Sequence, residues 1–481
     1  MSCFPGSPDI RCAGIRTRTT ASSALSVLSV VLLQALFSAA AVSGESTAAT
    51  SGGSGSSPNI IWIMADDLGY GDLGCYGQQK IQTPQLDRMA AEGLRFTQFY
   101  AGSTVCAPSR CVLMTGMHNG HGRIRDNLPL GVFLRPDDVT VAEVMKQAGY
   151  VTGMIGKWGL GDAGSFGVPT SQGFDEFYGH LTHTHAHFYY PQELWQNTTT
   201  VMLQGNRGNQ RKEYTQDLFT QRALTFLEQH RQRPFFLYLA YTTPHWSDFD
   251  RTLVQSQDVP SDVPYTDRDW PQVEKNYAAM VTRLDGDIGR ILDALKEHGL
   301  DQNTIVCFTS DNGPSAEKLH SVDFFDSNGP LRGHKRTMYE GGIRVPLIVR
   351  APGRVPAGVS TDAVHGFQDL LPTCAELAGL PVPNHTDGIS MVAALQGQTP
   401  ARGHEFLYWD YGHTRDGYQQ GIRLGTWKGV RNGKSGSVEL YDLARDVSET
   451  QNVAADYPDV LKQIEDLLRT VPVASADYPI K

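Results

Sequence analysis

The chain has few charged residues and no excess of basic ones. Of its 481 residues, 19% are charged and 40% are hydrophobic, which excludes a chain kept disordered by its own charge. Lysine and arginine number 41 against 51 acidic residues, giving a net charge of −10. An overall basic field for nucleic acid is therefore excluded, and we expect no nucleic-acid partner, although a local basic pocket is compatible with this charge.

Cysteine is also scarce. Seven are present, and Cys3 and Cys12 lie in a segment that we expect to be removed. The remaining five cannot all pair, so at least one thiol stands apart if the chain is exported. No two are spaced as C-x-x-C, which argues against a zinc site, and their spacing does not resemble that of a disulfide scaffold.

A long hydrophobic run occurs once, near the start of the chain. Three arginines precede the apolar residues 24–42, and the small residues 41–43 are typical of a cleavage site. We therefore predict a signal peptide over residues 1–43, followed by a linker rich in serine and glycine over residues 44–57. The alternative is an uncleaved membrane anchor, because the run approaches the ~20 residues that span a bilayer. With cleavage, we expect an exported protein, periplasmic or secreted.

Four short apolar runs form the strongest pattern in the rest of the chain, and each ends in polar residues. They are 59–64 before Asp66 and Asp67, 151–155 before Lys157, 235–241 before His245, and 304–308 before Asp311 and Asn312. Uninterrupted apolar runs of this length are typical of strands buried on both faces. Segments with helical apolar spacing separate them, at 85–93, 140–148, 214–230 and 276–298. The alternation predicts an α/β fold, with a large, mostly parallel sheet covered by helices on both faces.

A chain of this length exceeds the roughly 250–300 residues of a single core, so we expect a second unit. We place the larger unit at residues 58–383 and a smaller C-terminal α+β unit, packed on the main sheet, at residues 384–481. The smaller unit has strand patterns at 406–411, 421–431 and 438–443, and an amphipathic helix at 457–468. We expect its loops to face a substrate, with His413, Arg415 and Trp427 as candidates.

Polar side chains follow all four predicted strands. Because ligands of an open α/β sheet bind beyond the carboxyl ends of its strands, these side chains predict one site assembled from distant segments. Three carboxylates and an amide supply only oxygen atoms, which suits Ca²⁺ or Mg²⁺ rather than zinc. Each piece also has an ordinary explanation. Asp66-Asp67 and Asp311-Asn312-Gly313 are common turn sequences. His245 is also explained as a hydrogen-bonded histidine of a loop, and Lys157 as a solvated lysine on the surface. Their coincidence at one sheet edge favours a site.

The segment Cys106-Ala107-Pro108-Ser109-Arg110 has the form C-x-P-S-R, and Thr115-Gly116 follows it. In type I sulfatases this motif directs conversion of the cysteine to formylglycine, and the chain resembles that sulfatase family, within the alkaline-phosphatase-like superfamily. Residues 59–71, 329–346 and 421–454 are similar to three further family segments. The resemblance implies that residues 58–383 are the catalytic sulfatase domain.

The resemblance also implies a role for each candidate residue. One Ca²⁺ ion is bound by five side chains: Asp66, Asp67, Cys106, Asp311 and Asn312. Cys106, as formylglycine, is also the nucleophile, so a formylglycine-generating maturation enzyme is an expected partner. Four further catalytic residues surround the ester. Arg110 and Lys157 hold the nucleophile and the sulfate oxygens. His245 and Lys335 lie beside the sulfate and the leaving oxygen. These roles suit the chemistry, because a sulfate ester is an anion and its leaving oxygen needs a proton.

One position departs from the family pattern. Family members commonly carry Gly-Lys-Trp-His-Leu-Gly, whose histidine helps the sulfated intermediate collapse, whereas this chain has Gly159. In the family mechanism, one hydroxyl of hydrated formylglycine attacks sulfur, and the other must then lose a proton. We predict that His187 or His185 takes that proton, with His187 favoured because it adjoins the aromatic residues 188–190. The alternative is a surface loop with incidental histidines, or weak adventitious metal binding.

These patterns together predict an exported sulfatase that hydrolyses sulfate esters. We expect sulfated carbohydrates as substrates, with aryl and steroid sulfates as alternatives. Two other functions stay open: a phosphate or phosphonate ester hydrolase of the same superfamily, and a catalytically silent protein that binds sulfated glycans. The C-x-P-S-R motif favours the sulfatase, whereas Gly159 would explain the silent protein. Nothing in the sequence indicates the oligomeric state.

Overall fold

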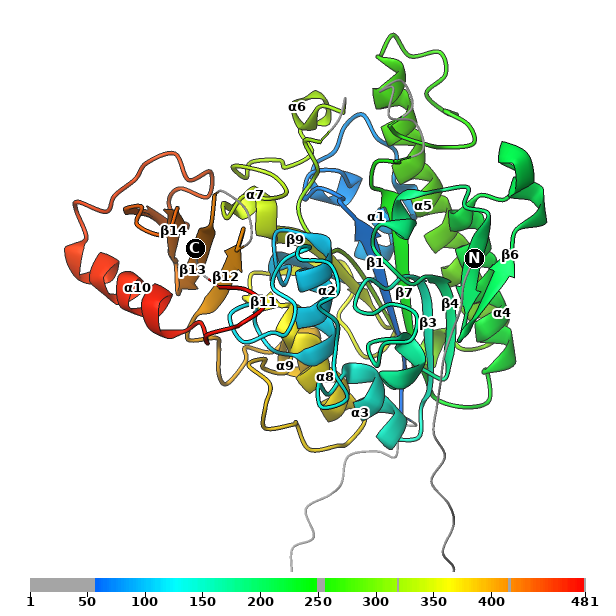
Figure 1. Cartoon of the computed structure of the whole chain (residues 1–481), viewed down its shortest axis with the longest axis horizontal. Coiled ribbons are helices and arrows are strands. Elements are labelled where there is room, and N and C mark those ends of the chain that lie inside the picture. Colours follow the sequence, from blue (N-terminus) through cyan, green and yellow to red (C-terminus); the bar gives the residue numbers. More distant parts are fainter. Residues whose placement is uncertain (1–56, 249–255, 318–319, 414–416, 480–481) are drawn as a thin grey trace, which may run out of the picture. The chain divides into compact units, whose positions relative to one another are not determined.

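The computed structural model describes residues 57–248, 256–317, 320–413 and 417–479 (Figure 1). The predicted signal peptide and all but the last residue of the predicted linker lie outside the described residues. Among the described residues, no helix is long and apolar enough to cross a membrane.

An 11-stranded sheet forms the main layer, in the order β10-β2-β9-β8-β1-β7-β3-β4-β5-β6, with β11 also paired to β2. The four predicted strands are all present near its centre, as β1 (Asn59–Asp66), β3 (Val151–Lys157), β7 (Phe235–Pro244) and β8 (Thr304–Ser310). The other strands are β2 (Leu94–Tyr100), β4 (Glu176–His180), β5 (Glu193–Gln196), β6 (Thr199–Met202), β9 (Arg344–Arg350), β10 (Val359–Thr361) and β11 (His365–Gly366).

The sheet is parallel at its centre and mixed toward its edges. Strands β8, β1, β7, β3 and β4 are parallel neighbours. Strand β9 is antiparallel to both β8 and β2, and β5 is antiparallel to both β4 and β6. All residues of β1, β3, β7 and β8 are buried, as uninterrupted apolar runs predict for strands covered on both faces.

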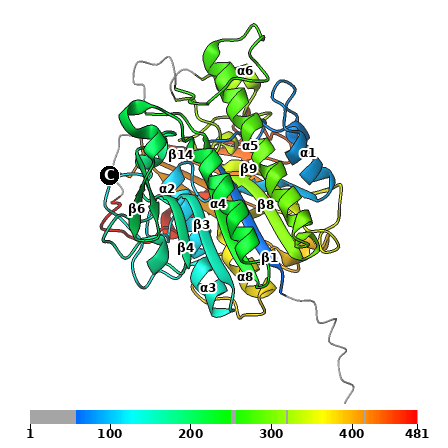
Figure 2. The ribbon, with the colours of Figure 1, turned by 90° about the vertical axis from the view of Figure 1, so that its right-hand side faces the viewer.

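Helices cover both faces, which confirms the predicted fold class. Alternate residues of β1 separate two cores, because Ile60 and Trp62 join one hydrophobic cluster and Ile61 and Ile63 join the other. The first cluster includes side chains of α2 (Cys106–Thr115), α3 (Val141–Gln147) and α8 (Leu370–Leu377). The second includes α1 (Pro84–Ala91), α4 (Thr215–Gln229) and α5 (Gln272–Glu297), and Figure 2 shows α4 and α5 crossing in front of the strands.

A second, four-stranded antiparallel sheet lies toward the C-terminus, in the order β12-β13-β14-β15. Its strands are β12 (Leu407–Tyr411), β13 (Gln419–Leu424), β14 (Trp427–Asn432) and β15 (Val438–Asp442), and α10 (Pro458–Thr470) packs on them through Ile464 and Leu468. The prediction of one strand over residues 421–431 is wrong. The chain reverses there, because Gly425 adopts a φ of 59° and Leu424 pairs with Trp427 in a tight hairpin.

This smaller sheet packs against the main unit through Trp409, whose Nε1 donates to the carbonyl of Ala101 at 2.8 Å. Lys428 of β14 forms a buried ion pair of 2.9 Å with Glu340 of α7 (Glu340–Ile343). The expectation that His413 faces a substrate is wrong, because its side chain is fully buried beside Asp410.

The remaining expectations concern the candidate residues Trp427 and Arg415 and the unpaired thiol. Trp427 packs its ring on Tyr457 at 4.6 Å, and Arg415 lies outside the described residues. All five cysteines of the described residues are free, so their odd number does not single out one thiol. Four of them are buried, and Cys75 is half-buried.

Candidate active site

Two parallel strands bring three acidic residues and an amide to one sheet edge. Asp66 ends β1 and Asp67 follows it, while Asp311 and Asn312 follow β8, whose Ser310 pairs with Ala65. The backbone N–H of Asp67 donates to Asp311 Oδ1 at 3.2 Å, and Asn312 Nδ2 donates to Asp67 Oδ1 at 2.8 Å. Asp67 has a φ of 66°, a left-handed conformation that an aspartate tolerates and that turns the chain at the strand end.

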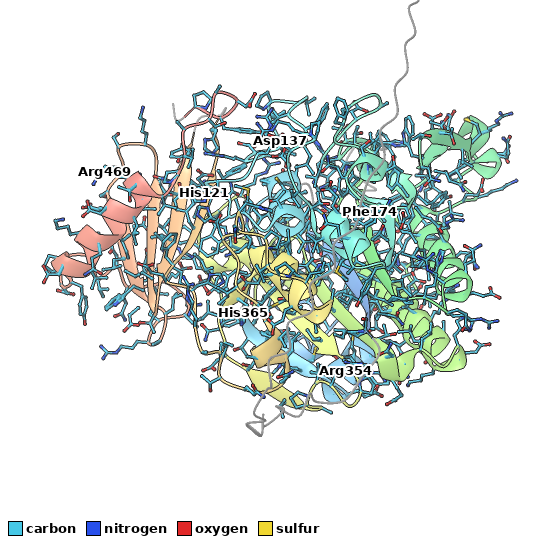
Figure 3. All side chains as sticks on the ribbon, turned by 90° about the horizontal axis from the view of Figure 1, so that it is seen from below. His121, Asp137, Phe174, Arg354, His365 and Arg469 are labelled. Atoms are coloured by element: carbon cyan, nitrogen blue, oxygen red, sulfur yellow. The ribbon has the colours of Figure 1, made fainter. Side chains whose placement is uncertain are left out.

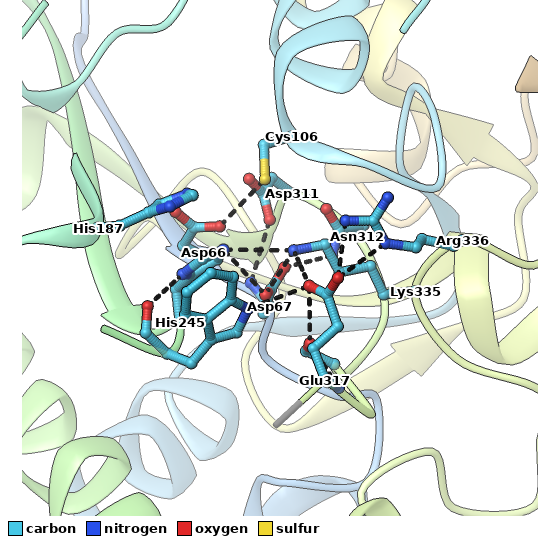
Figure 4. Close-up of polar contacts among 12 residues, drawn as sticks. Asp66, Asp67, Cys106, His187, His245, Asp311, Asn312, Glu317, Lys335 and Arg336 are labelled. Carbon is cyan, nitrogen blue, oxygen red and sulfur yellow. Dashed lines mark hydrogen bonds and ion pairs between the residues drawn. The ribbon is translucent and has the colours of Figure 1, made fainter. Parts of the chain in front are cut away.

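Three cationic side chains face these three carboxylates. Lys157 Nζ lies 2.6 Å from Asp66 Oδ2. Lys335 Nζ lies 2.8 Å from Asp67 Oδ2 (Figure 4). Arg110 Nη2 lies 2.7 Å from Asp311 Oδ2. All six side chains are at most 2% exposed, and their formal charges sum to zero.

Burial and charge act in opposite directions on the carboxylates. Burial disfavours the charged form of Asp66, but Lys157 and the other nearby cations outweigh it and hold its pKa below the usual range. Burial raises the pKa of Asp67 despite Lys335, and it raises the pKa of Asp311 with a further contribution from Asp66. The acidic groups are therefore crowded, as expected where a cation is to be bound.

The donor atoms suit a hard cation. Among the described residues, Asp66, Asp67, Cys106 and His245 present possible ligand atoms within 4.8 Å of one another. Asn312 Oδ1 is buried and has no hydrogen-bond partner among the described residues, which leaves a carbonyl oxygen available as a ligand. Carboxylate and amide oxygens are the preferred ligands of Ca²⁺, so these residues fit such an ion.

Cys106 begins α2, a helix that the sequence patterns did not predict. Its Sγ lies 3.5 Å from Asp66 Oδ1, and its side chain is 2% exposed. Burial raises the pKa of the thiol to about 12, with a further contribution from Asp66, so the unmodified cysteine is a poor nucleophile. The first turn is fastened to the sheet, because Ser109 Oγ donates to the carbonyl of Asp311 at 2.5 Å and Arg110 donates to the carbonyl of Lys157 at 2.7 Å.

His245 lies on the opposite side of the carboxylates from the helix (Figure 4). Its Nδ1 lies 2.7 Å from the carbonyl oxygen of Trp246, which assigns the proton to Nδ1. Its Nε2 lies 3.3 Å from Lys335 Nζ and 3.5 Å from Asp67 Oδ2. Burial, with the nearby His187 and Lys335, lowers the pKa of His245 well below its ordinary value.

Glu317 supports this region and was not predicted from the sequence. Its carboxylate accepts hydrogen bonds from Trp246 Nε1 at 3.0 Å and from Arg336 Nε at 3.0 Å, and lies 3.5 Å from Lys335 Nζ. These cations overcome burial and lower the pKa of Glu317 to about 2. A single glutamate in an irregular segment has no pattern by which it could have been found.

The two candidate bases differ in position. His187 stacks on His245 with ring centroids 4.2 Å apart, and its Nδ1 lies 3.0 Å from Asp248 Oδ2. His185 instead lies edge-on to the buried ring of His180, at 4.7 Å. The hydroxyl of Tyr189 donates to the carbonyl of His245 at 2.6 Å, so the predicted aromatic anchor ties this loop to the end of β7.

The family model described as Sulfatase matches residues 58–380, about two thirds of the chain. The chain belongs to the sulfatase family. A second model, described as N-sulphoglucosamine sulphohydrolase, C-terminal, matches residues 333–473 of this sulfatase. Membership places it in the alkaline-phosphatase-like superfamily and makes it a sulfuric ester hydrolase.

Three comparisons illustrate the similarity. Arylsulfatase A of Homo sapiens is 34% identical over 472 residues, which cover 85% of this chain and 87% of the relative. The solved structure of Ps i-CgsB in complex with k-i-k-neocarrahexaose is 30% identical, has a TM-score of 0.73, and matches over 86% of this chain and 93% of that one. A protein solved with its substrate D-glucosamine-2-N,6-O-disulfate is 26% identical, has a TM-score of 0.70, and matches over 86% and 97% of the two chains.

Cavities of about 410 to 780 Å³ occur in several places in the described part of this sulfatase. One of about 430 Å³ includes Ala107 and Gly159 in its wall and thus adjoins the nucleophile position. A larger one, of about 780 Å³, lies beside Arg431 and Arg469 in the C-terminal region. Neither cavity has a candidate catalytic residue in its wall. The smaller one is lined by Ala107, which follows Cys106 in the chain, and by Gly159, so it is the one relevant to the chemistry.

Two further His/Asp groups lie elsewhere in the described part of the sulfatase, and Figure 3 labels one histidine of each. One comprises His118, His121 and Asp387, and the other comprises His365, Asp369 and His404. In both, the aspartate accepts hydrogen bonds from imidazoles, at 3.0 Å from His121 and 2.7 Å from His365. These hydrogen bonds explain why the histidines and the aspartate of each group lie together, and both groups act as structural links between loops.

Proposed function

We propose that this sulfatase removes sulfate from sulfated carbohydrates, using a formylglycine formed from Cys106 and one bound Ca²⁺ ion. The observation that carries the proposal is the position of Cys106. Its side chain lies at the first turn of α2, in contact with Asp66, at a sheet edge where three carboxylates and three cations are buried together. A hydrated formylglycine there would supply one hydroxyl for attack on sulfur and a second whose proton must be removed.

The charge balance of the site supports the metal. The carboxylates of Asp66, Asp67 and Asp311 are matched one for one by Lys157, Lys335 and Arg110. A bound Ca²⁺ ion would leave the site with a net charge of about +2, which matches an anionic ester and helps to neutralise its oxygens. Asp66, Asp67, Asp311 and Asn312 would hold the ion, with the modified side chain at 106.

Lys335 and His245 handle the proton for the leaving oxygen. Lys335 Nζ lies 3.3 Å from His245 Nε2, so a proton is held between the two nitrogens. The carbonyl of Trp246 accepts the proton on Nδ1 and thus fixes the direction in which Nε2 points. Arg110 and Lys157 hold the nucleophile and the sulfate oxygens from the opposite side.

His187 takes the role that the family histidine has at position 159. Asp248 accepts the Nδ1 proton of His187 and leaves its Nε2 free to accept another. Burial lowers the pKa of His187, so the imidazole is neutral and able to accept a proton at neutral pH. His185 packs against His180 instead, which makes His187 the better candidate.

The substrate class is supported by the relatives. One neighbour was solved with a carrahexaose and another with a glucosamine disulfate as its substrate. The predicted signal peptide agrees with such substrates, because it would place the sulfatase outside the cytoplasm, in the periplasm or secreted. A maturation enzyme that generates formylglycine is then the required partner.

The test is sulfate release from a panel of sulfated saccharides, using protein whose formylglycine content has been measured by mass spectrometry. Each sulfate ester is paired with the phosphate ester of the same alcohol, and Cys106→Ala provides the inactive control. We expect sulfate release to exceed phosphate release by at least about a hundredfold in kcat/KM, which corresponds to about 2.7 kcal/mol of transition-state discrimination. Faster phosphate release, or full activity with unmodified Cys106, would overturn the proposal.

A further inference from the structure

A cavity of about 430 Å³ lies beside the position of the nucleophile. Its wall includes Ala107, which follows Cys106 in the chain. The backbone N–H of Ala107 donates to Asn127 Oδ1 at 3.0 Å, so the loop after residue 125 is fastened to the first turn of α2. This loop and the segments around residues 160 and 183 enclose the cavity, which therefore adjoins the edge of the sheet where the charged residues converge.

Gly159 opens this cavity. Its φ is 80°, and a Cβ placed on it would have atoms of His183 as its three nearest neighbours, the first at 3.5 Å. A larger side chain at position 159, such as the histidine common in the family, would thus project beside His183 into the cavity wall. The glycine therefore removes an imidazole and at the same time adds room for a ligand.

The charge of the cavity wall differs from that of the sheet edge beside it. The wall contains no lysine or arginine, and its charged members are Asp126 and the exposed Asp162. Asp126 is buried and accepts a hydrogen bond from the backbone of Gly412 at 3.1 Å, so Asp162 is the charge that a ligand meets. The cations that pair with the carboxylates of the sheet edge are Arg110, Lys157 and Lys335, and all three are buried where the scissile sulfate would bind.

The rest of the wall combines apolar and hydrogen-bonding groups. Leu130 and Phe133 offer apolar surface, whereas Thr182, His183 and Thr184 offer hydroxyl and imidazole groups. A pyranose ring has apolar C–H faces and a rim of hydroxyls, so it matches such a wall. A second sulfate or a carboxylate on that ring would instead lie near Asp162 with no cation in the wall to neutralise it.

We propose that this cavity is the subsite for the sugar that carries the scissile sulfate, and that it takes a neutral or amino-substituted pyranose without a second anionic group. The inference rests on the proposed sulfatase function and narrows its substrate. It distinguishes this chain from the neighbour solved with D-glucosamine-2-N,6-O-disulfate, whose substrate carries two sulfates.

The test measures kcat/KM on matched monosulfated and disulfated hexosides, including N-acetyl-D-glucosamine 6-sulfate with D-glucosamine 2-N,6-O-disulfate, and on 4-nitrophenyl sulfate. The wild type should prefer the monosulfated member of each pair. Asp162→Lys reverses the charge of the wall and should raise the relative kcat/KM of the disulfated member about five- to tenfold, as expected for a charge change of two units about 8 Å away. The gain should come from a lower KM for the disulfated member rather than from a higher kcat.

Asp267→Lys is the matched control, because it makes the same charge change at an exposed residue outside the cavity wall. A preference of the wild type for disulfated sugars, an unchanged ratio in Asp162→Lys, or an equal change in Asp267→Lys would each overturn the inference. Turnover of 4-nitrophenyl sulfate without turnover of any pyranose sulfate would overturn it while leaving sulfatase activity intact. Absence of sulfate release from every ester would instead overturn the proposed function.

Discussion

Removal of divalent cations should lower the thermal stability of this sulfatase without unfolding it. The three buried carboxylates keep their partners Lys157, Lys335 and Arg110 when no cation is bound, so the apo site carries no net charge. The loss is then limited to the binding free energy that couples to folding, about 4.1 kcal/mol when Ca²⁺ is present at a thousand times its Kd.

The corresponding change in melting temperature follows from chain length. The unit from Gly55 to Lys481 has about 430 residues, and an unfolding entropy of about 2.1 cal/mol/K per residue gives about 0.9 kcal/mol/K for the whole unit. Dividing the coupling free energy by this entropy predicts a decrease of about 5 °C. Calorimetry of protein dialysed against EGTA, followed by stepwise addition of Ca²⁺, Mg²⁺ or Zn²⁺, measures it directly.

Two variants make the experiment specific. Asn312→Ala removes the unpartnered buried oxygen and should abolish the response to Ca²⁺. Glu317→Gln changes a nearby acid that is bonded to Trp246 and Arg336, and it should retain the response. An unchanged melting temperature on chelation, a full response in Asn312→Ala, or stoichiometric zinc with no calcium would each refute the reasoning.

Three further predictions address the chemistry and the fold. His187→Ala should give one burst of product followed by stalled, sulfated enzyme detectable by intact mass, whereas His185→Ala should turn over normally; normal turnover in both would place the base elsewhere. Cys106→Ser should keep its circular dichroism spectrum and lose turnover, and peptide mass spectrometry of the wild type should show an aldehyde or its hydrate at position 106. Lys428→Met removes the buried cation shared by Glu340 and Glu449. Glu340 keeps its ion pair with Arg344, but Glu449 keeps none among the described residues, so the free energy of unfolding in urea should fall by about 3–5 kcal/mol at pH 8. Burial raises the pKa of Glu449 to about 7, so the folded protein takes up a proton there as the pH falls through 7. The deficit of Lys428→Met should therefore be smaller at pH 5 than at pH 8, and an equal deficit at both pH values would contradict this.

The central strands could be predicted from sequence because burial on both faces leaves a simple apolar pattern. Val151–Lys157 and Thr304–Ser310 are uninterrupted and end in polar residues, which located both the strand and the site edge. The edge strand Thr199–Met202 is largely exposed and has no such pattern. Position in the sheet, which a single sequence does not contain, therefore decided which strands could be found.

The site was predictable where its residues follow strands or belong to a motif. His183 was not, because its importance comes from the glycine that lies opposite it in space, 24 residues earlier in the chain. Asp248 was missed for a similar reason, since it becomes relevant only through its contact with His187. Both depend on how one loop packs on the end of a strand, and local sequence does not specify that packing.

The ion pair between Lys335 and Asp67 joins residues 268 positions apart, and the contact between Asp67 and Asp311 spans 244. Closing such long loops slows folding, so the site is expected to form late, after the central strands have paired. During synthesis, a nascent chain that has not yet released Lys335 lacks one of the three cations that neutralise the buried acids. The site therefore forms only when the fold is complete. A fragment ending before residue 335 lacks Lys335 and also β9, β10 and β11, so it should have an incomplete sheet and no tight metal site.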